Sequence, residues 1–441
     1  MLAGACALVV WQHGPAWADA APITSKRLAN GLTILIQEDH RLPSVGIAVA
    51  YAIGMRDEPP ALAGLCHVIE HALLGPSLHV PEGTGVRIER IGGVPNGRTT
   101  ADATETFEEL PSRYWELGLW IESDRMAYLL SVLDAAELQR IRETVKRESE
   151  RRANEYHDRL SEMSLEPIFP PGHPYANLGG RSEAVDDITL DYARTFFQQH
   201  FGPAEAVLAI VGDIDTERAS DAVNKYFASI TSSMTFEPRA MLSAASVKLE
   251  ADEERVLAPG LYRNWRYERL DMMWPTPAWF EPGDAELDVL ASVLQARLFK
   301  RFVLPASAFS VTVRQESLAL GSVFTIQFDI IPGHALDEIQ SELIQELQDL
   351  SRPSAAIARA RSRWRIRQIG QLDNMWERAS RLARTAAGLG HASSIESDVR
   401  RYELLRDEDI RRAADHFIAH APHVIVRSEF NKFMRQPRPV N

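Results

Sequence analysis

His67, Glu70 and His71 stand at positions i, i+3 and i+4 of one short segment. At about 100° per residue, this spacing places the three side chains on one face of a helix. Two imidazoles one turn apart can bind one zinc ion, and a carboxylate beside them can take a proton from a zinc-bound water. The trio is therefore a candidate site for metal-assisted hydrolysis.

The residues around the trio predict the helix that carries it. Gly75-Pro76 ends the periodic pattern. A solvated helix face that binds nothing is the alternative, and for an isolated histidine pair we would favour that alternative. Here the glutamate lies inside the pair and the opposite face is apolar throughout, so we favour a metal site. The apolar residues of that opposite face are Leu62, Leu65, Ile69, Ala72 and Leu73.

A third ligand is expected from a later helix, predicted from Ala135 to about residue 155. Glu148 falls on the apolar side of this helix, whereas Glu143 and Glu150 project from the other side and are rejected. A buried carboxylate without a partner costs several kcal/mol, so Glu148 needs a cation. Arg or Lys is the usual partner, but beside His67 and His71 zinc is the better one. The apolar side is formed by Leu138, Ile141 and Val145.

The elements that must position these residues alternate between strands and helices. A Ser-rich stretch at 229–246 then separates two halves with similar patterns. We predict α+β architecture: two homologous α/β domains in tandem, each a mostly antiparallel sheet backed by helices. The predicted boundaries are 21–230 for the zinc-binding domain, 231–246 for the linker and 247–441 for a domain without a metal site. The expected elements include strands at 26–38, 99–107, 265–270 and 271–274 and helices at 111–130 and 355–389.

Composition sets the broad class of protein. The chain has 441 residues, 45% of them hydrophobic and 25% charged, which is ordinary soluble globular usage. A net charge of −13 argues against a nucleic-acid partner. Two cysteines imply no disulfide framework, and no stretch is long and apolar enough to span a membrane.

The N-terminus has the pattern of an export signal. Residues 2–10 are small and apolar, and residues 16–20 supply small residues at cleavage spacing. We predict a signal peptide at 1–20, although a basic segment before it is absent and the natural start is expected further upstream. The predicted location is therefore periplasmic or secreted.

Several dispersed motifs resemble, in one order, those of the insulinase/pitrilysin family of zinc peptidases, in the short branch that includes mitochondrial processing peptidase. The resemblance runs from Pro22 onward and is strongest over residues 54–212. Its central feature is the inverted order His-x-x-Glu-His. The matching segments are Gly54-Met55-Arg56-Asp57-Glu58, residues 64–71, Gly92-Gly93 with Asn96, Thr99, Asp102 and Thr104, residues 117–120 and 123–126, 145–148, 172–175 and 211–213.

This resemblance implies roles for individual residues. His67, His71 and Glu148 bind one zinc ion per chain, and Glu70 is the general base that activates water. The strand at 99–107 is an exposed edge on which a substrate peptide docks by strand addition. Asn96 and Thr99 bind the substrate there, and the enclosing shell is a clamshell of two chains or half-chains.

The second half departs from the family pattern. The family places an Arg and, a few residues later, a Tyr across the chamber from zinc, where they bind substrate and stabilise charge on its carbonyl oxygen. Here Val303 stands at the Arg place and Phe309 at the Tyr place, and Arg301 substitutes only if the register slips. A phenyl ring donates no hydrogen bond. We therefore predict a heterodimer in which a homologous subunit without zinc supplies the Arg and Tyr.

Two other functions are compatible with the pattern. One is a non-catalytic peptide-binding or scaffold subunit derived from the family, which the missing Arg and Tyr weakly favour and the intact ligand set disfavours. The other is a zinc hydrolase acting on something other than peptides, which is supported only by the metal motif.

Overall fold

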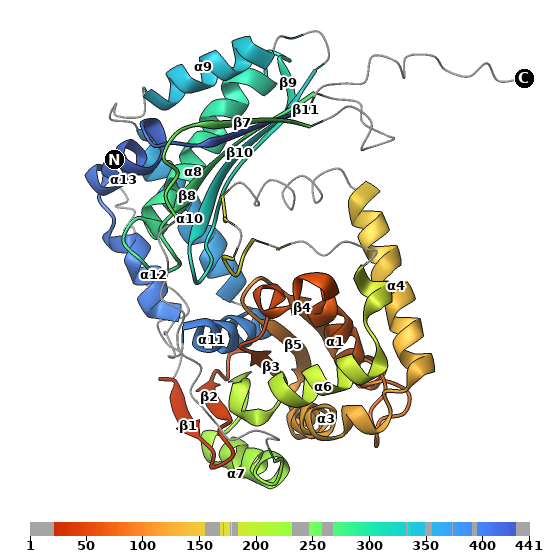
Figure 1. Cartoon of the computed structure of the whole chain (residues 1–441). Coiled ribbons are helices and arrows are strands. Elements are labelled where there is room, and N and C mark those ends of the chain that lie inside the picture. Colours follow the sequence, from red (N-terminus) through yellow and green to blue (C-terminus); the bar gives the residue numbers. More distant parts are fainter. Residues whose placement is uncertain are drawn as a thin grey trace, which may run out of the picture.

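A computed structural model describes residues 22–154, 168–170, 172–176, 178, 184–231, 247–257, 268–331, 334, 336–348, 355–372, 374–389 and 395–428. Two β-sheets, each covered by helices, lie at opposite ends of the molecule (Figure 1). The predicted signal peptide and all but the first residue of the predicted linker 231–246 lie outside these residues. No helix in the described part is long and apolar enough to cross a membrane.

The first sheet has six strands in the order β1-β2-β6-β3-β5-β4. β2 and β6 run parallel, and every other neighbouring pair is antiparallel. β4 therefore forms one edge of the sheet. The strands are β1 (Thr24–Arg27), β2 (Thr33–Glu38), β3 (Ser44–Tyr51), β4 (Val94–Thr99), β5 (Thr104–Pro111) and β6 (Ala206–Gly212).

The second sheet repeats this arrangement. Its order is β7-β11-β8-β10-β9, with β7 and β11 parallel and the rest antiparallel. In chain order, β7 to β11 therefore take the same places as β2 to β6, as expected of two homologous domains in tandem. The strands are β7 (Glu253–Leu257), β8 (Glu268–Thr276), β9 (Ala308–Glu316), β10 (Ser322–Ile330) and β11 (Val424–Ser428).

Helices fill the connections between strands. In the first half these are α1 (Leu65–Leu74), α2 (Thr84–Arg90), α3 (Trp115–Tyr128), α4 (Ala135–Asn154), α6 (Leu190–His200) and α7 (Thr216–Phe227). In the second half they are α8 (Asp284–Leu298), α9 (Leu336–Gln348), α10 (Ala355–Leu372), α11 (Met375–Leu389), α12 (Ile395–Leu404) and α13 (Asp407–Ala414). Short 3₁₀ or π-helical turns are η2 (Met55–Asp57), η3 (Pro60–Leu62), η4 (Ser112–Tyr114), η5 (Leu129–Ser131), η6 (Ala184–Asp187), η7 (Pro203–Glu205), η8 (Phe299–Val303) and η10 (Asp415–Ala419).

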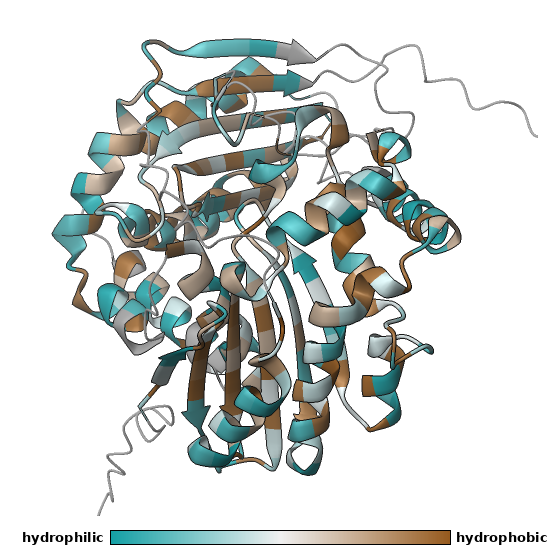
Figure 2. Cartoon of the chain, turned by 60° about the horizontal axis from the view of Figure 1, so that its bottom comes forward, coloured by the Kyte–Doolittle hydropathy of each residue, from teal (hydrophilic) through white to brown (hydrophobic). Residues whose placement is uncertain are grey.

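The first sheet is buried on both faces, and hydrophobic residues run along its central strands (Figure 2). One face, including Ile47 and Ile210, packs against α1, α3, α4, α6 and α7. The other face, including Ala48 and Ala209, packs in a core shared with α11 of the second half. The two halves are therefore joined by a helix of one lying on the sheet of the other.

Gly46 of β3 makes this contact possible. A Cβ at this position would lie 2.2 Å from the carbonyl oxygen of Met375, at the start of α11. The buried Arg378 follows one turn later and donates to Asp39 and, at 2.6 Å, to Gln37 Oε1. A close backbone approach and a buried ion pair thus fix α11 to the first sheet.

Several expected elements were wrong in detail. The strand expected at 99–107 is the β4–β5 hairpin: Thr99 pairs with Thr104, and the Thr100 hydroxyl accepts from Ala103 N to close the turn. The strand expected at 26–38 is likewise the β1–β2 hairpin, with Gly31 at φ +95°. Pro111 ends β5 instead of opening α3, residues 268–276 form one strand, and 355–389 holds two helices instead of one.

Candidate metal centre

Three predicted ligand atoms converge at the contact between α1 and α4. His67 Nε2 and His71 Nε2 each lie 3.4 Å from Glu148 Oε2. The two imidazole nitrogens are 3.2 Å apart. All three side chains remain partly accessible, with exposed fractions of 14%, 21% and 25% in the order His67, His71, Glu148.

These separations are those of a zinc coordination shell. Zinc binds nitrogen and oxygen ligands at about 2.0–2.1 Å in tetrahedral geometry, so two ligand atoms of one ion lie about 3.3 Å apart. The three separations of 3.2–3.4 Å match that edge length. In the described part of the chain, no other group of three or more His, Cys, Asp or Glu residues meets in this way. The three-residue donor set therefore fits one zinc ion.

The start of α1 is fixed by Glu58. Its two carboxylate oxygens accept hydrogen bonds from the backbone N–H groups of Gly64 and Cys66, both at 2.7 Å. Gly64 has φ +95°, a conformation that favours glycine. Burial raises the pKa of Glu58 to about 7, against the lowering effect of these hydrogen bonds. The apolar side of α1, including Leu65, Ile69 and Leu73, is fully buried and sets the rotation of the helix.

Helix α4 is oriented by the stripe that the sequence predicted. Leu138, Ile141 and Val145 are buried, whereas Glu143 and Glu150 are exposed. On a neighbouring side, Arg142 and Lys146 form ion pairs with Asp186 of η6. This anchoring turns Glu148 toward the histidines of α1.

Glu70 lies on α1 between the two histidines and is only 8% exposed. Its Oε2 accepts a hydrogen bond of 2.7 Å from Thr99 Oγ1, the last residue of β4. Gly97 lies against the same side chain, and a Cβ there would be 2.8 Å from Glu70 Cγ. The contacts of Gly97 were not foreseen from the sequence, because they depend on where the β4–β5 hairpin turns.

The open edge of β4 lies beside Glu70. Thr100 N–H bonds to Ala103 O, and antiparallel pairing alternates from there, so the backbone groups of Thr99 and Gly97 point away from β5. Pro95, which has no N–H, occupies another outward position, as expected on an edge strand. The Asn96 side chain is exposed and its Oδ1 accepts from Gly97 N–H at 2.8 Å. Asn96 thus caps an edge donor.

At the two positions where the resemblance expects an Arg and a Tyr, the described part of the second half holds other side chains. Phe309 lies on the edge strand β9 and is 58% exposed. Arg301 lies in η8 and pairs with Glu342 of α9 at 2.8 Å. Val303 packs against the hydrophobic core of that half.

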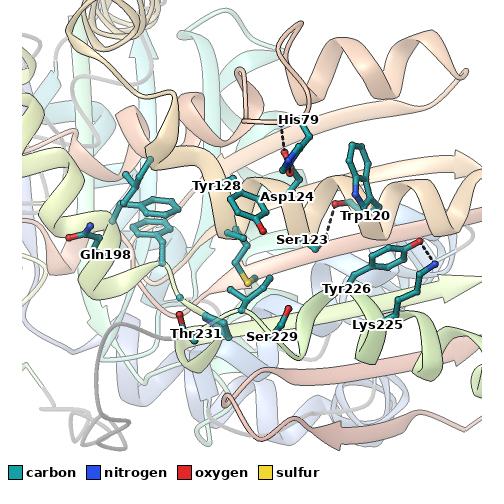
Figure 3. Close-up of a pocket in the computed structure, with 18 residues that line it drawn as sticks. His79, Trp120, Ser123, Asp124, Tyr128, Gln198, Lys225, Tyr226, Ser229 and Thr231 are labelled. Carbon is teal, nitrogen blue, oxygen red and sulfur yellow. Dashed lines mark hydrogen bonds and ion pairs between the residues drawn. The ribbon is translucent and has the colours of Figure 1, made fainter.

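A separate cavity of about 680 Å³ lies between α3, α6 and α7 (Figure 3). His79 and Asp124 form an ion pair at its rim, with Nδ1 and Oδ1 2.5 Å apart. Ser77 also donates to Asp124. None of the predicted site residues lines this cavity, so it is distinct from the candidate metal centre.

Sequence comparison finds zinc proteases at low identity. The family model described as the Peptidase M16 inactive domain matches residues 187–363. An uncharacterized zinc protease of Mycobacterium leprae is 23% identical over 419 residues, covering 90% of this chain and 89% of the relative. The zinc protease PqqE of Helicobacter pylori is 22% identical over 342 residues, covering 74% of each chain.

Structure comparison gives the class of fold. A protease from Helicobacter pylori matches 92% of this chain and 99% of its own, with TM-score 0.80 and 19% identity. The periplasmic protease PqqL from Escherichia coli matches 94% of this chain but 48% of its own, with TM-score 0.71 and 17% identity. The chain therefore has an M16-like two-domain fold, and its homologues include M16-family proteins named as zinc proteases.

Proposed function

We propose that this chain is a zinc metalloendopeptidase that cleaves peptides or unfolded segments. The observation that carries the proposal is the convergence of His67, His71 and Glu148 at the ligand spacing of a tetrahedral zinc ion. The names of the homologues support the same class of activity. When bound, zinc supplies the Lewis acidity that makes water a nucleophile at neutral pH.

The residues of the chain supply the remaining chemistry. Glu70 is the general base, which takes the proton of the attacking water on a carboxylate oxygen and later gives a proton to the leaving amine. The open edge of β4 pairs with an extended peptide, whose backbone is held beside Glu70 by the N–H of Thr99 and the carbonyl oxygens of Gly97 and Thr99. The N–H of Gly97 is already bound by Asn96 Oδ1. Strand addition binds main chain and not side chains, so it suits unfolded substrates of varied sequence.

We further propose that the active form is a heterodimer. Support comes from Phe309 and from Arg301, whose guanidinium is held by Glu342 on α9. A homologous subunit without zinc ligands would bring the Arg and Tyr across the chamber. This chain matches 48% of the PqqL chain from Escherichia coli and 92% of a structure of the first half of that protein. Export to the periplasm or beyond, with residues 1–20 as signal peptide, belongs to the same proposal.

The test measures zinc content and cleavage of an unstructured fluorogenic peptide by the purified chain, with and without a candidate partner subunit. We expect about one zinc per chain and chelator-sensitive cleavage that rises when the partner is added. Glu70→Gln should keep its zinc and lose about 10²- to 10⁴-fold in kcat. If the zinc-loaded Glu70→Gln variant cleaves the peptide as fast as zinc-loaded wild type, the peptidase proposal is contradicted. If no partner subunit changes the cleavage rate, the heterodimer proposal is contradicted.

A second candidate is a non-catalytic peptide-binding subunit. The exposed phenyl ring of Phe309 favours it, since this side chain binds apolar groups but donates no hydrogen bond. In that case the chain binds the fluorogenic peptide with the same affinity when zinc is bound and after a chelator has removed the zinc. Turnover stays absent with every partner.

A further inference from the structure

The side chain of Thr99 is directed at Glu70. Thr99 Oγ1 donates to Glu70 Oε2 at 2.7 Å, and both residues are at least partly buried. The hydrogen bond joins the end of an edge strand to the middle of α1, across 29 residues of chain. A hydroxyl that already donates to a carboxylate has no further proton to give to a substrate carbonyl.

Gly97, at the next position on that face of β4, lies beside the same side chain. A Cβ at residue 97 would lie 2.8 Å from Glu70 Cγ and 3.0 Å from Oε1. The lack of a Cβ at residue 97 therefore leaves room for the aliphatic part of Glu70, while Thr99 holds the carboxylate. Together the two residues determine where the Glu70 side chain lies.

The backbone and the side chains of these two residues point in different directions. Their N–H and C=O groups project to the open edge, whereas the side chain of Thr99 and the Cα face of Gly97 turn to α1. At Thr99, an incoming peptide that pairs with the edge would meet the backbone groups and not the side chain. The substrate and the base therefore share one strand but use different atoms of it.

We infer that Thr99 is a positioning residue for Glu70 and not a substrate-binding side chain, an inference that rests on the proposed peptidase function. Its hydroxyl holds the base in the orientation needed to accept a proton from water above the docked peptide. Proton transfer requires hydrogen-bond reach, and small misplacements of a reacting group are costly in rate. A Cβ at residue 97 would press on Glu70 Cγ, so Gly97→Ala is expected to shift the base.

The experiment compares Thr99→Val, Thr99→Ser and Gly97→Ala with wild type. Thr99→Val removes the hydroxyl at nearly constant volume, and Thr99→Ser retains it. We expect Thr99→Val and Gly97→Ala to lose about 10- to 100-fold in kcat, with zinc content unchanged, and Thr99→Ser to recover most of the rate. Fluorescence anisotropy of a labelled peptide on zinc-free Thr99→Val should give a Kd within about twofold of wild type, because edge pairing is intact.

A weaker peptide Kd with unchanged kcat in Thr99→Val would make Thr99 a substrate-binding side chain, and unchanged values of both would make its hydroxyl idle. Either result overturns the inference. A crystal structure of zinc-free Thr99→Val gives a readout that needs no turnover. A Glu70 carboxylate that has rotated away from β4 supports the inference, and one in the wild-type position overturns it. Absence of cleavage by wild-type protein instead counts against the proposed function, while this structural readout still decides the role of Thr99.

Discussion

At the scale of single residues, the candidate centre is defined by where three side chains end. His67 and His71 share a helix, so their mutual distance follows from the spacing alone. Glu148 reaches them from another helix, and its distance depends on how α1 and α4 pack. The carboxylate is therefore the most informative residue to change.

Glu148→Gln should weaken zinc binding by more than about 100-fold, because even partners of metal ligands are worth 10- to 100-fold in affinity. Glu143→Gln is the matched control, since Glu143 is exposed on the same helix and turns away from the histidines. Zinc affinity is measured by competition with a chromophoric chelator. Equal zinc affinity in the two variants would show that Glu148 is not a ligand.

The sequence predicted which side chains meet at the candidate metal centre, but it did not predict which way the residues of β4 face. The spacing of His67, Glu70 and His71, and the apolar stripe below Glu148, predicted side chains that the structure brings together. Asn96 and Thr99 were predicted to bind substrate. That assignment stays a prediction for Asn96 and for the backbone of Thr99, whereas we infer that the Thr99 side chain positions Glu70. Their hydrogen bonds, to Gly97 N–H and to Glu70, depend on which way each residue faces across a strand. A one-residue uncertainty in strand position reverses that direction.

At the scale of elements, α11 is the helix that joins the two halves of the chain. It belongs to the second half but covers a face of the first sheet, where Arg378 is buried beside Asp39. Burial alone would raise the pKa of Asp39, but hydrogen bonds from Arg41 and Arg378 hold it below its usual range. The carboxylate therefore remains charged in the folded protein and needs its cations.

Arg378→Ala should lower the free energy of unfolding by about 3–5 kcal/mol, because it leaves a buried carboxylate with one cation fewer. The double variant Arg378→Ala with Asp39→Asn should recover part of that loss, since the charge is removed with its partner. Urea denaturation measures both. An additive double variant would mean that the two residues do not interact.

Sequence patterns could not predict this element correctly. Residues 355–389 predict one long helix, because the helical pattern continues across the break between α10 and α11. The break exists because α11 must reach the other half, and that contact depends on Gly46, far away in the chain. Likewise, the hairpin at 99–107 was predicted as one strand because threonines lie on both sides of its turn, which consists of residues 100–103.

At the scale of the whole molecule, the two halves share one strand order and differ in what their matching helices carry. α1 bears the histidines, whereas α8, between β8 and β9, bears Asp284 and Asp288. Tyr402 donates to Asp288, and Arg401 donates to Asp284. The two-domain plan was predicted correctly from the weak repeat in the sequence.

The pKa of Asp288 is raised to about 7, chiefly by burial and then by the charges of Asp284 and Asp398, against the effects of Tyr402 and Arg401. The folded state therefore binds more protons than the unfolded state between about pH 4 and 7, and stability falls as pH rises through this range. Asp288→Asn should remove that fall, and gain about 4 kcal/mol relative to wild type between pH 4 and 7.

Asp415→Asn is the control for this measurement, because its side chain is 72% exposed. Unfolding by urea at several pH values gives the two curves. A wild-type curve parallel to that of Asp288→Asn over the range would contradict the assignment of this dependence to Asp288.

The ligands of the candidate centre come from opposite ends of a long stretch of chain, at residues 71 and 148. During synthesis on the ribosome, the histidines emerge first. They are followed by β4, β5 and α3, and only then by the carboxylate of Glu148. Until α4 has emerged and packed, a nascent chain holds two ligands and binds the ion weakly. A three-ligand centre built in this way is incomplete in any copy of the chain that ends before Glu148 of α4.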